Sequence, residues 1–220
     1  MALTTFEIEP TERQRGTVIW LHGLGASHHD FEPVVPELAA PFLRFVFPSA
    51  PARAVTVSYG MRMPAWYDIL SVGAHASHED ASHLRESAIE LEALLVREHE
   101  RGVACQNIVL AGFSQGGAMV LHVGLRSARR LGGILVLSGY LPAAHALQAE
   151  AEPARRDTPI LFCHGRHDRV VPYAGGHKSY TLLKAAGYAA EWAEFDIAHT
   201  MSIDEVRFIT AWLAARFPPR

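Results

Sequence analysis

Cysteine is scarce in this chain, whose 220 residues include only Cys105 and Cys163. Two cysteines cannot build the disulfide framework that stabilises small secreted proteins. Residues 1–15 are polar and charged, and no later apolar run reaches the length that crosses a bilayer. We therefore expect a cytoplasmic protein that does not insert stably into membranes.

A strong charge imbalance is also missing, because the formal net charge is −3 at pH 7. Nucleic acids and anionic membranes attract an excess of basic residues, so the composition argues against both as partners. The chain lacks internal repeats, linker-like stretches and low-complexity segments. With 49% hydrophobic residues it can bury one sizeable core, and we expect residues 1–220 to form a single domain.

What the chain does contain is a regular alternation of apolar runs and helical patterns. The runs predicted as strands are residues 17–22, 43–47, 108–111, 133–137, 159–163 and 189–197. Helices are predicted at residues 30–38 with Asp30 as the cap, at 79–100, 116–128 and 173–186, and after a capping box at residues 202–205. Residues 49–76 follow neither period and are expected to form an irregular excursion. This order predicts an α/β fold with a mostly parallel central sheet and helices on both faces.

The stretch around Ser114 carries the clearest chemical signal. Gly112-Phe113-Ser114-Gln115-Gly116 stands between an apolar strand and a helix, which is the nucleophile elbow of α/β-hydrolases. Glycines without a Cβ let the strand and the helix approach closely while the serine hydroxyl stays exposed. The pattern also arises by chance in glycine-rich loops, but its strand–turn–helix context argues against that. We therefore predict Ser114 as a nucleophile.

An orienting carboxylate should follow the nucleophile. In α/β-hydrolases the triad members occur in the order Ser, Asp or Glu, His, each in a loop after a strand. Only Asp168 follows a predicted strand end, whereas the other downstream aspartates precede a strand, lie within one or begin a helix (Asp157, Asp196 and Asp204). The alternative for Asp168 is a surface carboxylate paired with Arg166 or Arg169.

Position must select the base, because 13 histidines make the mere presence of histidine uninformative. His199 stands between the last predicted strand and the last predicted helix, where the order rule requires a base. We expect surface or supporting roles for the other downstream histidines, which are His145, His164, His167 and His177.

An oxyanion hole needs two backbone N–H groups, one from the residue after the nucleophile and one from a loop after an earlier strand. Gln115 supplies the first. The loop His22-Gly23-Leu24-Gly25 is placed to supply the second through the N–H of Leu24. We expect His22 itself to brace this loop as a buried imidazole rather than to act as a base.

Several motifs together give a family resemblance over nearly the whole chain. They are residues 18–25 (VIWLHGLG), 47–51 (FPSAP), 61–68 (MRMPAWYD) and 112–117 (GFSQGG), then His164-Gly165-x-x-Asp168 with Val171-Pro172, and His199. With them the chain resembles the bacterial carboxylesterase and acyl-protein thioesterase family of α/β-hydrolases. The resemblance implies the same triad and oxyanion donors, and it allows a homodimer. Two positions depart from the family pattern: Ser49 stands where the family usually has His, and Ala198 where it often has Gly.

These residues predict a serine hydrolase that cleaves carboxylic esters of short to medium acyl chains through an acyl-enzyme, with no metal or organic cofactor. The substrate would be a small-molecule acyl ester or thioester. An acyl-protein thioesterase is the alternative within the same chemistry, because it shares every catalytic residue. A catalytically idle α/β-hydrolase fold that serves as a binding module is the alternative of a different class, and it would show a broken triad or a blocked elbow.

The substrate entrance is expected to be open. The stretch between the strands predicted at residues 133–137 and 159–163 is too short for a cap domain. The excursion at residues 49–76 should then shape the entrance, with apolar walls from Met61, Met63, Trp66, Tyr67 and Leu70. Ordinary core packing is the alternative for this cluster.

Overall fold

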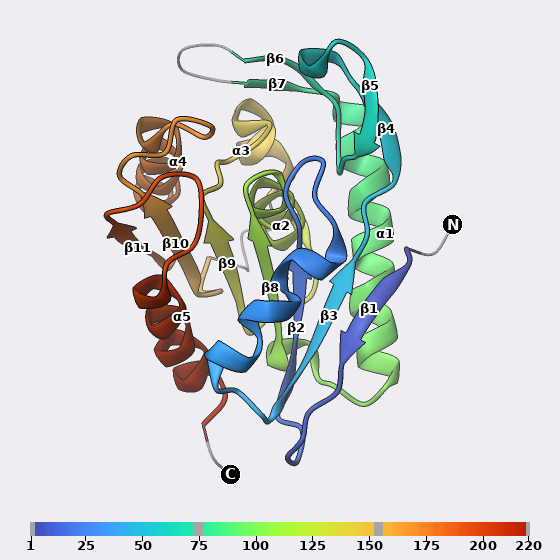
Figure 1. Ribbon diagram of the computed structural model, residues 1–220, viewed down its shortest axis with the longest axis vertical. Coiled ribbons are helices and arrows are strands. Elements are labelled where there is room, and N and C mark those ends of the chain that lie inside the picture. The colour runs from blue at the N-terminus through green and yellow to red at the C-terminus, as the bar shows by residue number, and fades with distance from the viewer. Residues whose placement is uncertain (1–2, 73–76, 152–155, 219–220) are drawn as a thin grey trace.

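A seven-stranded sheet forms the centre of the computed structural model, which describes residues 3–72, 77–151 and 156–218 (Figure 1). The strand order is β1-β3-β2-β8-β9-β10-β11. Only β1 is antiparallel to its neighbour, which confirms the mostly parallel sheet predicted from the sequence. The strands are β1 (Thr5–Ile8), β2 (Gly16–Leu21), β3 (Leu43–Pro48), β8 (Ile108–Phe113), β9 (Gly133–Leu137), β10 (Ile160–Gly165) and β11 (Ala190–Phe195).

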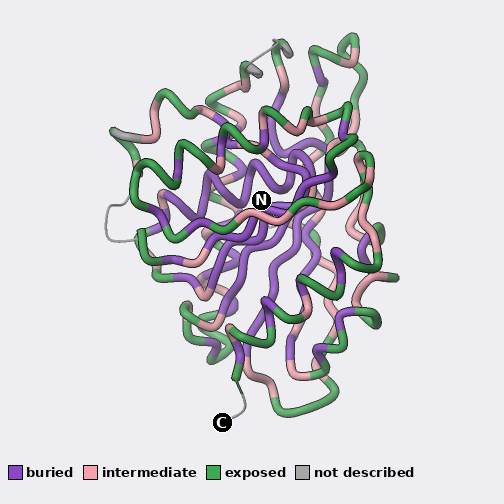
Figure 2. Tube along the Cα trace, turned by 90° about the vertical axis from the view of Figure 1, so that its left-hand side faces the viewer, coloured by how far each residue is buried: buried purple, intermediate pink, exposed green. Residues whose placement is uncertain are grey.

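Helices cover both faces of this sheet. One face packs against α1 (Ala81–Glu100), α2 (Gln115–Arg126) and α4 (Tyr173–Ala185). The other packs against α5 (Ile203–Arg216) and the 3-10 helices η1 (His28–Val34) and η2 (Pro36–Leu38). Successive side chains of a strand point to opposite faces, and each buried strand therefore contributes to both cores. Figure 2 shows the buried residues gathered between the helical layers.

The period of α1 explains how it packs. Leu84, Leu91 and Leu95 lie on one buried stripe, and Ala88 packs partly buried against the same core. The carboxylate of Asp80 accepts a hydrogen bond from the N–H of His83 at 2.9 Å. This cap fixes the helix start at Ala81, two residues later than predicted.

Two predicted helix caps differ from the structure. Asp30 does not cap a helix; Ser27 caps η1, and Asp30 accepts a hydrogen bond back from the N–H of Ser27 at 3.2 Å. The predicted helix is two 3-10 segments, in keeping with prolines at positions 33 and 36 that lack the N–H group a longer helix needs. At α5, Ser202 accepts from the N–H of Glu205, but the reciprocal half of the capping box is absent.

The excursion predicted as irregular contains two small antiparallel sheets, so that prediction was wrong. β4 (Ala52–Val55) pairs with β5 (Met61–Pro64) around the 3-10 helix η3 (Thr56–Ser58), and β6 (Ile69–Val72) pairs with β7 (Ser77–Glu79). Figure 1 shows both beyond the upper end of the central sheet. Residues 73–76, the end of the predicted excursion, lie outside the described residues.

The connection between β9 and β10 spans residues 138–159. Its described part forms η5 (Ala144–Ala146) and the four-residue helix α3 (Leu147–Glu150), while residues 152–155 lie outside the description. A further 3-10 turn, η4 (Cys105–Asn107), precedes β8. Within the described chain, no helix is both long and apolar enough to cross a membrane.

Candidate active site

Ser114 occupies the sharp turn between β8 and α2. Its backbone has φ 54° and ψ −118°, a region that residues with a side chain rarely adopt. The N–H of Ser114 donates to the carbonyl of Leu137 on the neighbouring strand at 2.8 Å, which helps to hold this conformation. The turn directs the serine into a cavity, although the residue as a whole is largely buried.

Glycines permit this turn because strand and helix nearly touch there. A Cβ on Gly112 would lie 2.3 Å from the carbonyl oxygen of Gly116, and a Cβ on Gly116 would lie 2.5 Å from that of Leu21. Both distances are well below van der Waals contact, so a side chain at either position would push the elbow apart. The glycines of the motif therefore serve packing rather than chemistry.

Asp168 and His199 meet at the end of the sheet where the loops after β10 and β11 come together. Nδ1 of His199 lies 2.7 Å from Oδ2 of Asp168. The other carboxylate oxygen accepts the N–H groups of Val170 and Val171, each at 2.9 Å. The surface ion pair with Arg166 or Arg169, considered above, is therefore not how this carboxylate is used.

The charge state of Asp168 follows from these contacts. Burial acts to raise the pKa of this carboxyl group, but the hydrogen bond and charge of His199, together with the two amides, outweigh burial and lower the pKa. An ionised Asp168 requires the proton of the neutral imidazole to sit on Nδ1. Nε2 of His199 is then left with a lone pair, as a general base needs.

Ser114 and His199 line the same cavity, and the ring of Phe113 packs against that of His199 with centroids 4.7 Å apart. Among the hydrogen bonds of the described residues, none joins the Ser114 hydroxyl to the imidazole. Such bonds are often long without substrate and shorten when it binds. The structure thus brings Asp168 and His199 into direct contact and places Ser114 on the same wall.

The predicted oxyanion donors also lie on this cavity. Leu24 and Gln115 line it, and no acceptor among the described residues uses the backbone N–H of either. The N–H of Gln115 is at the N-terminus of α2, where negative charge is favoured. Both amides are therefore available to a developing oxyanion.

His22 braces the loop that carries Leu24, as expected. The buried ring contacts the carbonyl of Gly23 through Nδ1 at 2.7 Å, and Nε2 accepts the N–H of Ala50 at 3.0 Å. Burial lowers the pKa of His22, which keeps the ring neutral. With both nitrogens bonded to backbone groups, His22 is not available as a base.

The side chain of Gln115 ties the elbow to the excursion. Its oxygen accepts the N–H of Trp66 at 2.9 Å, and its amide group donates to the carbonyl of Tyr67 at 2.8 Å. The indole N–H of Trp66 in turn donates to the carbonyl of His22 at 2.9 Å. Residues 66 and 67 of this motif thus connect the elbow to the end of β2, just before the loop that carries Leu24.

The apolar walls predicted for the entrance were wrong. Trp66 and Tyr67 are completely buried in the core, while Met61 and Leu70 are exposed, and neither these residues nor Met63 line the cavity. The indole N–H of Trp66 is bonded to the carbonyl of His22, and the hydroxyl of Tyr67 contacts that of Tyr140 at 2.9 Å, so both rings are held inside the core. Apolar walls come instead from Val57 and Ile69 of the excursion and from residues of other elements, among them Leu84, Ala88, Leu141, Val171 and Met201.

The cavity has a volume of about 1630 Å³, more than most small-molecule sites need. It begins at Ser114 and extends along α2 between α1, the β9–β10 connection and α4. The described residues contain no group of three or more His, Cys, Asp and Glu side chains placed to hold a metal ion.

The remaining downstream acids and histidines have other contacts. Asp157, Asp196 and Asp204 pair with the arginines Arg130, Arg166 and Arg207 respectively. His167 binds Asp196, His177 stacks on Tyr173, and His145 is exposed.

His164 supports the site, one of the two roles expected for it from the sequence. It is completely buried, its Nε2 donates to the carbonyl of Val171 at 2.9 Å, and it lies 3.6 Å from Oδ2 of Asp168. Burial lowers its pKa, so the ring is neutral. His164 thereby supports the loop whose amides hold Asp168. Its place one residue before the end of β10 and its part in the motif His164-Gly165-x-x-Asp168 were the available signals.

The two departures from the family pattern are accommodated locally. Ser49 Oγ lies 2.5 Å from Nδ1 of His28, outside the catalytic loops. Ala198 does not have a positive φ, so the backbone before His199 does not require glycine. Neither departure disturbs the contact between Asp168 and His199.

Known proteins resemble this chain along most of its length. The model of the phospholipase/carboxylesterase family matches residues 4–216. Acyl-protein thioesterase 1 of Gibberella zeae is 35% identical over 215 residues, which cover 93% of this chain and 92% of that protein. A probable carboxylesterase of Oryza sativa subsp. japonica is 35% identical over 206 residues, which cover 91% of this chain and 77% of that protein.

Solved structures of related proteins have the same fold as this chain. Arabidopsis thaliana SOBER1 matches with a TM-score of 0.88 and 31% identity, covering 93% of this chain and 100% of that chain. Zea mays acyl-protein thioesterase 2 matches with a TM-score of 0.88 and 26% identity, covering 98% and 99%. The fold is therefore the α/β-hydrolase fold, as predicted. These relatives are eukaryotic and give no support to the bacterial branch expected from the sequence.

Proposed function

Because this chain belongs to the phospholipase/carboxylesterase family, and is thus a hydrolase of esters or thioesters, we propose that Ser114, His199 and Asp168 are its catalytic triad. The observation that carries the proposal is the 2.7 Å contact between His199 and Asp168 beside an elbow whose serine has a positive φ. Such a backbone conformation costs a residue with a side chain about 1 to 3 kcal/mol, and strain of this kind is typical of active sites. The idle binding module is therefore the weaker alternative.

The proposed reaction has two halves. Nε2 of His199 takes the hydroxyl proton as Ser114 Oγ attacks the acyl carbonyl, and then gives that proton to the departing alcohol or thiol. Water attacks the resulting acyl-enzyme with the same imidazole as base, which releases the acid and restores the Ser114 hydroxyl. Asp168 holds the Nδ1–H tautomer and stabilises the imidazolium in both halves.

The N–H groups of Leu24 and Gln115 would receive the oxyanion in both halves. One such donor is worth on the order of 3 kcal/mol of transition-state stabilisation. This role agrees with the absence of any acceptor for these two amides among the described residues. Hydrolysis by this route uses neither a metal nor an organic cofactor.

We propose short to medium acyl esters of small alcohols as substrates. A second candidate, an acyl-protein thioesterase, is favoured by the long cavity of about 1630 Å³ with its apolar walls. It is also favoured by the names of the relatives from Gibberella zeae and Zea mays. A single domain over residues 1–220, a cytoplasmic location and a homodimer remain predictions; the family match over residues 4–216 supports the first.

Replacement of the nucleophile tests the triad. We expect Ser114→Ala to lower kcat for p-nitrophenyl butyrate by about 10⁴-fold or more, because a triad without its serine retains only the catalysis of its oxyanion hole. Circular dichroism should show an unchanged fold. Ser82→Ala, at an exposed position in the first turn of α1, is the matched control and should keep full activity. Turnover by Ser114→Ala within tenfold of wild type would overturn the proposal.

A chain-length series separates the two candidate functions. Wild type is assayed on p-nitrophenyl esters and on acyl thioesters with roughly 2 to 16 acyl carbons, a range that a cavity of this size can test. A maximum of kcat/KM at short or medium esters supports the esterase. A maximum at long-chain thioesters supports the thioesterase.

A further inference from the structure

The far end of the cavity differs chemically from the end that holds Ser114. α2 begins at Gln115 in the elbow, and its later residues His122 and Arg126 line the same cavity. His122 lies eight positions after Ser114, about 12 Å along the helix axis. Between the two ends the walls are largely apolar. A substrate bound at Ser114 therefore has a polar region within reach.

His122 is the central residue of that region. It is only 5% exposed, and its Nδ1 is buried without a hydrogen-bond partner. Nε2 has no partner among the described residues either, but it is not buried, so it is the ring nitrogen that faces the cavity. Nδ1 stays enclosed whatever the cavity holds, whereas Nε2 is open to it. Nε2 is therefore the ring atom that can donate a hydrogen bond to a group bound in the cavity.

Two arginines accompany His122. Arg126 donates from Nε to Glu150 at 2.8 Å and from Nη1 to the carbonyl of His122 at 3.3 Å, while its Nη2 is buried with no partner in the described chain. Arg85 projects from α1 onto the cavity and, unlike Arg126, forms no ion pair with a described carboxylate. The charges that act on His122 are Arg126, Glu150 and Arg85, two cations against one anion.

We propose that His122, Arg85 and Arg126 form a subsite that binds an anionic oxygen group of the substrate, about two helical turns from the scissile carbonyl. A carboxylate or phosphate oxygen accepts a hydrogen bond from the ring N–H of His122 while its charge faces Arg85. Burial lowers the pKa of His122 to about 4, so at neutral pH the ring acts as a neutral donor and Arg85 supplies the charge. The inference rests on the proposed function, because it assumes that the ester is held at Ser114.

The acyl chain and the leaving group could each carry the anion. One substrate series has p-nitrophenyl monoesters of linear diacids of increasing length, each paired with the same compound capped as a neutral methyl ester. A second series has hexanoyl thioesters of thiols that end in a carboxylate, again paired with their methyl esters. For each pair the ratio of kcat/KM, anionic over neutral, measures recognition of the charge alone.

Wild type should prefer the anionic member at one range of lengths in one of the two series. Arg85→Gln should lower that ratio by roughly tenfold, since a charged hydrogen-bond partner is lost. His122→Gln should lower it as well. Arg207→Gln is the matched control, because it removes an exposed arginine from α5, away from the cavity, and it should keep the wild-type ratio.

The outcomes separate this inference from the proposed function. Preference in the diacid series assigns the anion to the acyl chain, and preference in the thioester series assigns it to the leaving group. A ratio near one at every length, or a ratio that Arg85→Gln leaves unchanged, overturns the subsite even when the neutral esters are hydrolysed normally. Failure of the neutral esters themselves would instead count against the triad. Because Arg85 is exposed, its variant remains informative if His122→Gln does not fold.

Discussion

Glu205 is a buried acid that lies outside the cavity that holds Ser114. It sits in the first turn of α5, is 1% exposed, and its Oε2 has no partner among the described residues. Burial raises the pKa of the Glu205 carboxyl group from 4.5 to about 7, although the backbone N–H of Ser202 acts to lower it. The carboxylate form is therefore penalised in the folded protein and not in the unfolded chain.

The raised pKa of Glu205 makes the free energy of unfolding depend on pH. Because the folded-state pKa is the higher one, stability is lost as pH rises from 4.5 to about 7 and is constant above that window. We expect Glu205→Gln to remove this loss, so that the variant is more stable than wild type at pH 8.5 by up to about 3 kcal/mol and equal to it near pH 4.5. Urea unfolding at both pH values measures the difference.

Asp204→Asn serves as the control for this experiment. Asp204 is the neighbouring acid in the same helical turn, but its side chain is 77% exposed. Its replacement should change stability by less than about 0.5 kcal/mol. A stability difference between Glu205→Gln and wild type that is the same at pH 4.5 and pH 8.5 would show that Glu205 is not the titrating group.

Single residues differ in how well the sequence reveals them. Asp168 and His199 could be selected because chain order and strand ends are visible in the sequence, and the structure brings the two into contact. The contacts of His164 and the burial of Glu205 could not be foreseen, because they depend on elements distant in the chain. For Glu205 the spacing from Ser202 predicts the cap at the start of α5, which forms through the N–H of Glu205, but it does not predict that the side chain is buried.

The elbow is the element on which the site depends, and its fit is set by Gly116. We expect Gly116→Ala to lower the free energy of unfolding by roughly 1 to 3 kcal/mol, or to prevent folding, because the added Cβ would overpack the contact between α2 and β2. In this structure that atom would lie 2.5 Å and 2.6 Å from the carbonyl oxygens of Leu21 and His22. Urea unfolding, with kcat on p-nitrophenyl butyrate, measures both consequences.

A second glycine in a helix provides the matched control. A Cβ on Gly175 in α4 would meet no atom within 4 Å. Gly175→Ala should therefore stabilise the protein by about 0.5 to 1 kcal/mol through the better helix propensity of alanine. If Gly116→Ala were as stable as Gly175→Ala, close approach at the elbow would not be the reason for glycine.

Elements with a clear period were predicted well, and those without one were not. α1 and β9 follow their apolar patterns to within two residues. The pairs β4–β5 and β6–β7 escaped prediction because strands of three or four residues cannot display an alternation, and β5 ends in Pro64. The direction of Trp66 and Tyr67 was equally hidden, since the indole of Trp66 donates to the carbonyl of His22 and the hydroxyl of Tyr67 contacts that of Tyr140, both distant in the sequence.

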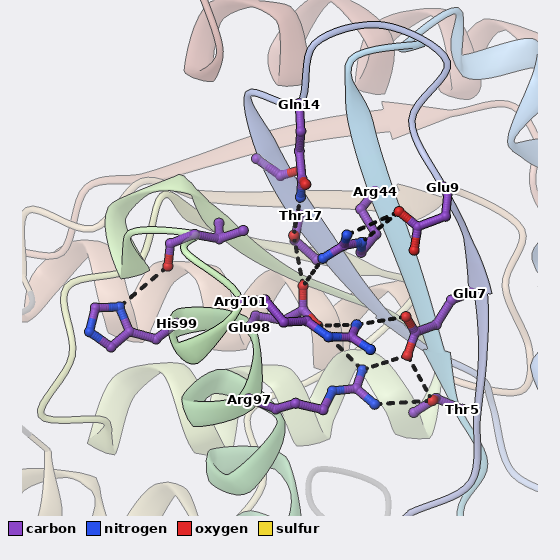
Figure 3. A network of polar contacts seen from close by, with 12 residues as sticks. Thr5, Glu7, Glu9, Gln14, Thr17, Arg44, Arg97, Glu98, His99 and Arg101 are labelled. Carbon is purple, nitrogen blue, oxygen red and sulfur yellow. Dashed lines mark hydrogen bonds and ion pairs between the residues drawn. The ribbon is translucent and has the colours of Figure 1, made fainter.

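At the scale of the whole molecule, one buried carboxylate joins elements that are far apart in the sequence. Glu98, in the last turn of α1, is completely buried and accepts hydrogen bonds from Thr17 of β2 at 3.1 Å and Arg44 of β3 at 3.2 Å (Figure 3). Arg101 also donates to it at 3.0 Å and reaches Glu7 of β1 at 2.7 Å. The network fastens α1 to the β1 edge of the sheet.

This arrangement separates stability from catalysis. None of these residues lines the cavity that holds Ser114, and α1 contributes to that cavity with its opposite end, near Leu84 and Arg85. The sequence alone could not reveal the network, because its members come from four elements and only the fold brings them together. A change in Glu98 should therefore act on folding and leave the reaction alone.

We expect Glu98→Ala to lower the free energy of unfolding by roughly 2 to 4 kcal/mol, because it leaves the buried hydroxyl of Thr17 without its acceptor and removes one of the two carboxylate partners of Arg44 and of Arg101. Glu92→Ala is the matched control: it removes a carboxylate of the same helix whose pair with Arg129 is partly exposed, and it should cost less than about 1 kcal/mol. Urea unfolding gives both values. The folded fraction of Glu98→Ala should keep wild-type kcat on p-nitrophenyl butyrate; a loss of kcat with unchanged stability would mean that this network acts on the active site rather than on the fold.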